Sequence, residues 1–131
     1  MNRTLATFLT SACLAGAATL TGCSGSTTHG TAYTVTITRH VKAFLGYDHE
    51  TVYNTALETL SETFMYEIEE DKLDGRTGYI KGRTAKGNIA TFSVTRDSKA
   101  MSEVSVFVGP VGDADAAQDI LSRVENALRD R

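Results

Sequence analysis

Two cysteines give this chain its options for thiol chemistry, and removal of residues 1–22 would separate one from the other. Cys13 falls inside an uncharged stretch at residues 4–22, and Cys23 follows directly after it. A thiol can serve as a nucleophile, a disulfide partner, a metal ligand or an acylation site. Loss of residues 1–22 would leave Cys23 alone, so that neither a disulfide nor a thiolate metal pair could form.

The segment before Cys23 has the organisation of a secretory signal. Arg3 supplies one positive charge, and residues 4–22 combine leucine, alanine and phenylalanine with no charge. A basic start, a short apolar run and small residues near the cut are typical of such signals. Two alternatives stay open. A retained transmembrane helix would need about 20 mostly apolar residues, and this stretch is diluted by threonine and serine. Ordinary cleavage after Ala17 would fit the A-x-A pattern of residues 15–17.

The end of this segment resembles the lipobox of bacterial lipoproteins. That pattern is Leu, a small residue, Gly or Ala, and then Cys, and it is matched by Leu20-Thr21-Gly22-Cys23. The resemblance implies a diacylglycerol on the Cys23 thiol, cleavage just before it, and often a further acyl chain on its new amine. Several chains would hold the protein at a membrane, whereas one binds only reversibly. Ser24, rather than Asp, follows the cysteine. By resemblance to Gram-negative lipoproteins, this favours the periplasmic face of the outer membrane.

The remaining chain has the size and charge of one ordinary domain. Cleavage before Cys23 leaves 109 of the 131 residues, and loss of Arg3 changes the formal net charge from −3 to −4. We expect a lipidated cysteine and flexible Ser/Gly/Thr tether at residues 23–31, and a single domain at residues 32–131. The mild acidity argues against nucleic-acid binding and against a second, electrostatic attachment to anionic lipid.

Hydrophobic periodicity predicts an α+β fold, a two-layer sandwich with two helices on one face of a mainly antiparallel sheet of about five strands. Residues 33–45 alternate as one strand, except that Arg39 falls on the apolar face and indicates a bulge or an edge. Asp48 is a candidate N-cap for the first helix, and Asp113 or Asp115 for the last. We expect the other strands at residues 65–70, 77–84, 89–95 and 104–108, as sequential neighbours. The partner of the first strand stays open.

The whole of this region resembles a family of small bacterial lipoproteins known only as a domain of unknown function. The matching features, between about residues 32 and 128, are Asp48-x-x-x-Val52-Tyr53-x-x-Ala56-Leu57, Asp74-Gly75, Lys86-Gly87 and Val108-Gly109-Pro110-Val111-Gly112-Asp113. The family often has a tryptophan in the first helix, where this chain offers Tyr53. The resemblance implies an architecture and brings no established activity.

Other residues that could do chemistry have simpler interpretations. The glycines of residues 109–113 could cradle an anion, but a tight turn with an Asp113 cap fits better because a phosphate loop would need a Lys-Ser/Thr pair. An acidic patch matches no calcium loop; it comprises Glu67, Glu69, Glu70, Asp71 and Asp74. We expect His40 and His49 to be exposed. We predict no catalytic residue, no metal site and no cofactor.

These observations predict a non-enzymatic, membrane-anchored lipoprotein of the bacterial cell envelope. It would attach through lipid on Cys23 and bind an envelope protein or help maintain the envelope. The alternative is a binding module for a small apolar or envelope ligand, for which Phe44, Tyr79 and Phe107 would provide a surface if they project outward. The oligomeric state is not predicted.

Overall fold

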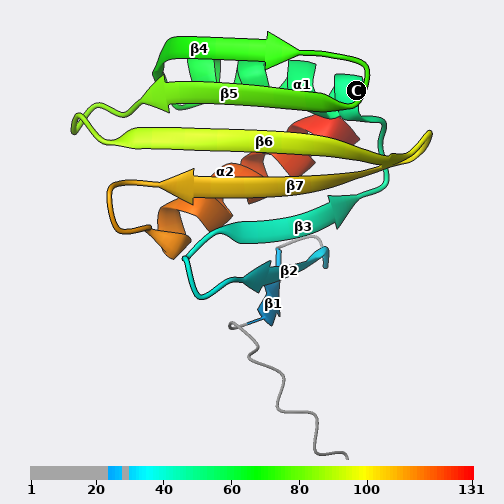
Figure 1. Cartoon of the computed structure of the whole chain (residues 1–131), viewed down its shortest axis with the longest axis horizontal. Coiled ribbons are helices and arrows are strands. Elements are labelled where there is room, and N and C mark those ends of the chain that lie inside the picture. Colours follow the sequence, from blue (N-terminus) through cyan, green and yellow to red (C-terminus); the bar gives the residue numbers. More distant parts are fainter. Residues whose placement is uncertain (1–23, 28–29) are drawn as a thin grey trace, which may run out of the picture.

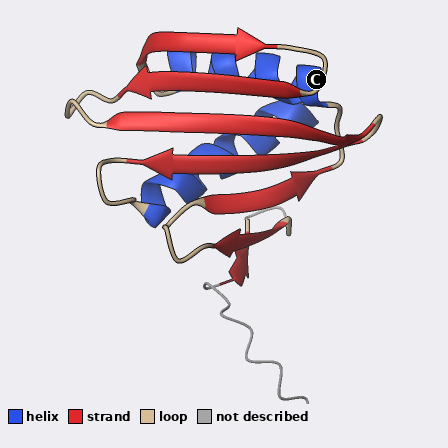
Figure 2. Cartoon of the chain, viewed as in Figure 1, coloured by secondary structure: helices blue, strands red, loops and turns tan. Residues whose placement is uncertain are grey.

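The computed structural model describes residues 24–27 and 30–131, which form an antiparallel sheet with two helices on one face (Figure 1). Its elements are β1 (Ser24–Ser26), β2 (Ala32–Val35), β3 (Val41–Leu45), α1 (His49–Glu58), a π-helical turn η1 (Thr59–Thr63), β4 (Glu67–Leu73), β5 (Thr77–Arg83), β6 (Ile89–Ser98), β7 (Met101–Val108) and α2 (Ala114–Arg129). Figure 2 shows the helices and the sheet as two layers. The predicted α+β class is confirmed, but the described sheet has seven strands rather than about five.

The strands lie in the order β1-β2-β3-β7-β6-β5-β4, and every neighbouring pair is antiparallel. The last four strands are sequential neighbours, as predicted. β3 is the strand that joins the N-terminal part to this meander, because it pairs with β7 from Val41 opposite Val106 to Leu45 opposite Ser102. Among the neighbouring strands, β3 and β7 are the farthest apart in the sequence, and they pair near the middle of the sheet.

The prediction of one strand at residues 33–45 is wrong, because a turn at residues 36–40 divides it into β2 and β3. The Arg39 amide donates to the Thr36 carbonyl at 2.8 Å, and the His40 amide donates to Thr36 Oγ1 at 3.1 Å. Arg39 has a φ of 60°, which turns the chain. Neither a bulge nor an edge position explains this residue. The turn is built by threonine hydroxyls and a left-handed arginine, so the usual glycine and proline signals are absent.

A second difference lies just after Cys23, where we expected a flexible tether. Ser24–Ser26 form β1, which pairs with β2 from Ser24 opposite Thr34 to Ser26 opposite Ala32. Backbone pairing does not need apolar side chains, so a Ser-Gly-Ser sequence can add a short edge strand that hydrophobic patterning does not reveal. The described part of that segment therefore belongs to the sheet. Cys23 itself and residues 1–22 lie outside the described residues.

The core lies between the sheet and the two helices. β3 and β5–β7 alternate buried and more exposed residues, so one face of each strand points to the helices. Asp48 caps α1 by accepting from the Thr51 amide, and Asp113, not Asp115, caps α2 by accepting from the Ala116 amide. The apolar stripes of both helices pack on the inner sheet face, and none of the described helices lies over the opposite face (Figure 1).

Candidate functional site

The face of the sheet that the helices do not cover is the main candidate surface. The pairing register places Tyr79 of β5, Ser93 of β6, Ser105 of β7 and Lys42 of β3 in one row across it. Because neighbouring strands lie about 4.8 Å apart, this row is about 14 Å wide. We call the outward-facing residues of β3 and β5–β7 the uncovered face. A surface of this width can contact another protein across several strands.

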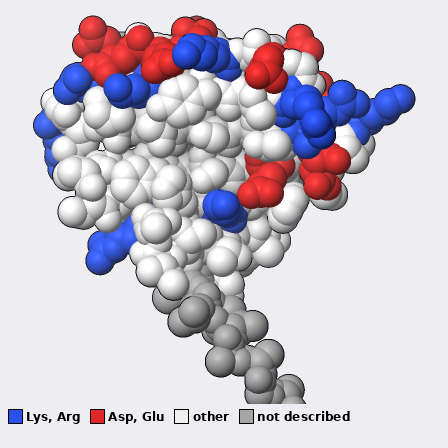
Figure 3. Space-filling model, viewed as in Figure 1, with Lys and Arg blue, Asp and Glu red and all other residues white. Residues whose placement is uncertain are grey.

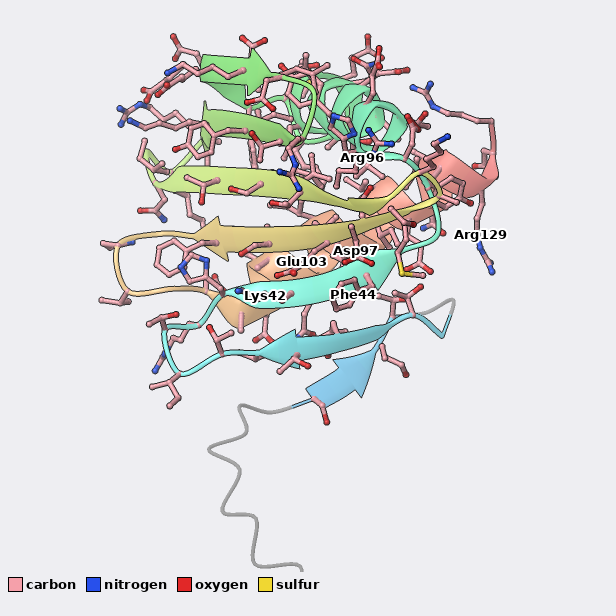
Figure 4. The ribbon with its side chains drawn as sticks, turned by 45° about the vertical axis from the view of Figure 1, so that its right-hand side comes forward. Lys42, Phe44, Arg96, Asp97, Glu103 and Arg129 are labelled. Carbon is pink, nitrogen blue, oxygen red and sulfur yellow. The ribbon has the colours of Figure 1, made fainter. Side chains whose placement is uncertain are left out.

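Aromatic side chains project from the uncovered face. Phe44 on β3 is 54% exposed, and Phe107 on β7 is half-buried against the His40 ring, with ring centroids 4.6 Å apart. Figure 4 shows Phe44 beside Lys42 and Glu103, which form an ion pair at 3.7 Å. Phe44 and Phe107, together with half-buried Tyr79, thus lie on one face, as the small-ligand hypothesis requires.

Charge is unevenly distributed around this face. Figure 3 shows acidic and basic side chains along the β4 edge and at the right-hand end, and few charged side chains over the middle of the sheet. The ion pair of Lys42 and Glu103 belongs to this middle region. That middle region consists largely of serine, threonine and aromatic side chains. It carries Thr91 opposite Phe107 and Ser93 opposite Ser105. A surface of this composition favours apolar and hydrogen-bonding contacts over electrostatic attraction.

The β4 edge uses its charges in structural contacts. Glu69 receives two close contacts from Arg83, from Nε at 2.7 Å and from Nη2 at 2.6 Å, and Lys81 lies 3.7 Å away. Glu70 pairs with Lys72 at 2.8 Å. The hydrogen bond and charge of Lys72 hold the pKa of Glu70 below its ordinary value, and Glu70 in turn raises the pKa of Lys72. Charges and the bulge after Ile68 protect this edge strand from pairing with another chain.

Two further carboxylates of the predicted acidic patch have separate roles. Asp74 closes the β4–β5 turn, because Oδ1 accepts from the amides of Arg76 and Thr77, both at 2.8 Å. These amides lower the pKa of Asp74. Asp71 accepts from the Tyr53 hydroxyl at 2.9 Å. Burial, followed by this contact with Asp71, raises the pKa of Tyr53 to about 12. Among residues 24–27 and 30–131, no group of three His, Cys, Asp or Glu residues converges as a metal site.

The loop at residues 109–113 is a tight turn with a helix cap, as predicted. Gly109 and Gly112 have φ values of 78° and 86°, and the Asp113 amide donates to the Val108 carbonyl at 2.7 Å. The Asp113 carboxylate is occupied in capping α2. Gly112 is also required by space, because a Cβ there would lie 2.5 Å from the Cβ of Arg39. The glycines therefore serve the close approach of two loops.

Both histidines differ from their predicted exposure. His49 is buried, and its Nε2 lies 2.9 Å from the Asp74 carbonyl, which links the start of α1 to the β4–β5 turn. His40 is half-buried, and its Nδ1 lies 3.2 Å from Ser105 Oγ. A histidine in the first turn of a surface helix usually faces water, and here the neighbouring turn covers it. Both contacts are structural.

Glu125 is a buried acidic residue that hydrophobic patterning did not single out. It is 4% exposed, and its carboxylate accepts hydrogen bonds from the hydroxyls of Thr27, at 2.6 Å, and Thr31. A hollow of about 340 Å³ lies beside it, next to Tyr47 and Arg129. The sequence signal that could have revealed Glu125 is its position on the apolar stripe of α2, four residues after Leu121. These contacts fasten the segment after Cys23 to the last helix.

A model of one protein family matches residues 2–127, and its description is "Protein of unknown function (DUF3568)". The chain belongs to this family. The match spans both the N-terminal segment with the lipobox pattern and the folded part, so one family pattern includes them together. No curated protein matches the chain. Of the helices that the structure describes, none has both the length and the hydropathy needed to span a bilayer.

Proposed function

We propose that this member of the family is a lipid-anchored, non-enzymatic module of the bacterial cell envelope, which presents the uncovered face to a partner protein. Lipid on Cys23 would hold it at a membrane, on the periplasmic face of the outer membrane. The observation that carries the binding role is a sheet face that none of the described helices covers, with few charged side chains in its middle (Figure 3) and with Phe44 exposed on it. Aromatic anchors surrounded by polar residues are typical of protein interfaces.

The edge strands favour partner binding at the uncovered face over the addition of a partner's strand to an edge of the sheet. β4 carries four acidic residues, one lysine and a bulge, and β1 has only three residues. Short or charged edge strands are poor templates for an added strand. Glu69 and Glu70 of β4 are engaged in ion pairs, and Asp74 after it holds the β4–β5 turn, which supports a structural rather than a catalytic role for them.

Site-specific photo-crosslinking in cells tests the binding role. A photoreactive residue replaces Ser93 at the centre of the uncovered face, and the matched control replaces Asp119 on the outer side of α2, whose side chain is 57% exposed. The proposal predicts a discrete crosslinked partner from position 93, lost when Phe44→Ser is added, and none from position 119. Equal crosslinking from both positions, or none from position 93, would contradict it.

A second candidate function is binding of a small apolar ligand beside Phe44. A hollow of about 370 Å³ lies there between β2, β3 and β7, lined in part by Tyr33, Ala43 and Glu103. Native mass spectrometry of protein purified from membranes would detect a retained ligand. This candidate predicts a bound apolar molecule that Phe44→Ser removes. A ligand-free spectrum for protein extracted under mild conditions would argue against it.

A further inference from the structure

The chain enters the described fold at one end of the sheet. β2 runs toward the turn at residues 36–40, and antiparallel β1 runs away from that turn, with Ser24 opposite Thr34. The described chain therefore begins, at Ser24, on the side of the turn. The residue before Ser24 is Cys23, and consecutive Cα atoms are only about 3.8 Å apart.

Two further loops lie at the same end. β7 ends beside the start of β3, where Val106 pairs with Val41, so its following loop at residues 109–113 neighbours the turn at 36–40. Ala90 opposite Val108 places the β5–β6 turn at residues 84–88 next to it. We call these three loops the entry end; they lie on the left in Figure 1. The turn at residues 36–40 touches the loop at residues 109–113, because Arg39 Nη1 donates to the Gly112 carbonyl at 3.4 Å.

The entry end carries the most exposed large apolar side chains of the described residues. Ile37 is 74% exposed and Val111 is 77% exposed, and they belong to the two touching loops. Met65, 78% exposed, precedes β4 at this end, since β4 begins opposite the last residue of β5. Single exposed apolar residues are ordinary. Their common position, at the end where the chain enters, is the informative feature.

The segment after Cys23 is held against the body of the protein. Ser24 is paired in β1, and the hydroxyl of Thr27 donates to buried Glu125 of α2 at 2.6 Å. A chain fastened in this way does not act as a long spacer. Anything attached at Cys23 is therefore kept close to the entry end.

We propose that the entry end rests on the bilayer, with Ile37 and Val111 inserted at the boundary between headgroups and acyl chains. This inference rests on the proposed lipid at Cys23, which would bring a membrane to this end and to no other. The contact would be mainly apolar, because Arg39 and Lys86 against Asp113 leave these loops with only one net positive charge. The strands would then stand upright on the membrane, and the uncovered face would point sideways toward a partner.

Tryptophan fluorescence in vesicles tests this orientation. The chain has no tryptophan, so Ile37→Trp and Val111→Trp each create a single reporter in the full chain. Met101→Trp, at the opposite end of β7, is the matched control because Met101 is also exposed, at 41%. Each variant is purified from membranes and reconstituted in phosphatidylcholine vesicles whose lipids carry bromine high on the acyl chains. Interfacial insertion reaches about 5–10 Å, within reach of that quencher.

The expected result is a blue-shifted, quenched emission for Ile37→Trp and Val111→Trp, and unquenched emission for Met101→Trp, with no change at high salt. Equal quenching of all three variants, or none of the first two, would overturn the orientation. Mass spectrometry of the same samples reports lipid at Cys23 independently. Lipid without end-specific quenching would reject the orientation alone. Quenching of the first two variants without lipid would support the orientation and reject the anchor.

Discussion

Tyr53 and Gly78 show how closely single residues of the core depend on one another. A Cβ at Gly78 would lie 2.7 Å from the ring of Tyr53 and 2.9 Å from a methyl group of Val94. The aromatic ring of α1 therefore packs directly on the backbone of β5. The tyrosine stands where the family resemblance led us to expect an aromatic residue, and the glycine is its counterpart on the strand.

Gly78→Ala should destabilise the protein by about 1–3 kcal/mol, because overpacking forces side chains and backbone to shift. Gly75→Ala is the matched control. A Cβ at Gly75 meets nothing within 4 Å, so this change should stay within about 0.5 kcal/mol of the wild type. Urea denaturation measures both free energies of unfolding. Equal values for the two variants would show that the close packing of Tyr53 on β5 is wrong.

The pKa of Tyr53 predicts a loss of stability in alkali. Its pKa is about 12 in the folded protein against an ordinary value of 10, so above pH 10 the unfolded chain releases this proton first. The stabilisation is complete below pH 10 and disappears as the pH rises toward 12. Tyr53→Phe should therefore make the free energy of unfolding fall less steeply over this range. Asp71→Asn should have a smaller effect in the same direction, because burial is the larger cause.

Urea denaturation at several pH values between 9 and 12 would compare the three proteins. Parallel curves for wild type and Tyr53→Phe would contradict the raised pKa.

At the scale of elements, the pattern of buried residues predicted the helices and the four-strand meander, but not the N-terminal strands. The helices were recognisable because their apolar stripes and Asp48 and Asp113 caps are local in sequence. The turn at residues 36–40 was not, since Thr36 and Arg39 carry no usual turn signal and alternation continues through them. β1 lacks an apolar face altogether. Such elements depend on backbone and hydroxyl hydrogen bonds, which hydrophobic periodicity does not report.

The candidate surface was predictable only in part for the same reason. Alternation placed Phe44, Tyr79 and Phe107 opposite the apolar positions of their strands, and the structure has all three on the uncovered face. Their gathering on one face depends on β3 pairing with β7, which the sequence left open. The charges of β4 were predicted as a patch, whereas pairing across to β5 distributes them among separate partners.

The fastening of β1 and β2 to α2 makes a prediction of its own. Thr27→Val removes the hydroxyl that donates to Glu125 and accepts from the Thr31 amide, which leaves a buried carboxylate with one donor fewer. The loss is worth about 1–3 kcal/mol, and about 1.4 kcal/mol corresponds to tenfold. Amide hydrogen exchange in residues 24–27 and 31–35 should therefore accelerate by about tenfold or more, while exchange in β5 and β6 stays unchanged.

Asp119→Asn changes an exposed acidic residue of α2 that pairs only loosely with Arg123, at 3.7 Å, and is the control. Unchanged exchange at β1 and β2 in Thr27→Val would mean that Glu125 does not hold this segment.

At the scale of the whole molecule, both proposals depend on Cys23, the residue before β1. The sheet brings Ser24 to the end that carries Ile37 and Val111, and it turns the uncovered face away from that end. An anchor at Cys23 would thus set both the contact with the membrane and the direction in which Phe44 is presented. Without the anchor, the same fold would have no fixed orientation.

Mass spectrometry of the N-terminal peptide, from protein expressed in a bacterial host and extracted from its membranes, tests this anchor most directly. We predict a mature chain that begins at Cys23 and carries diacylglycerol on the thiol. Cys23→Ala should remain uncleaved at this position and carry no lipid. A secreted chain with a free Cys23 thiol, cut after Ala17, would contradict the account.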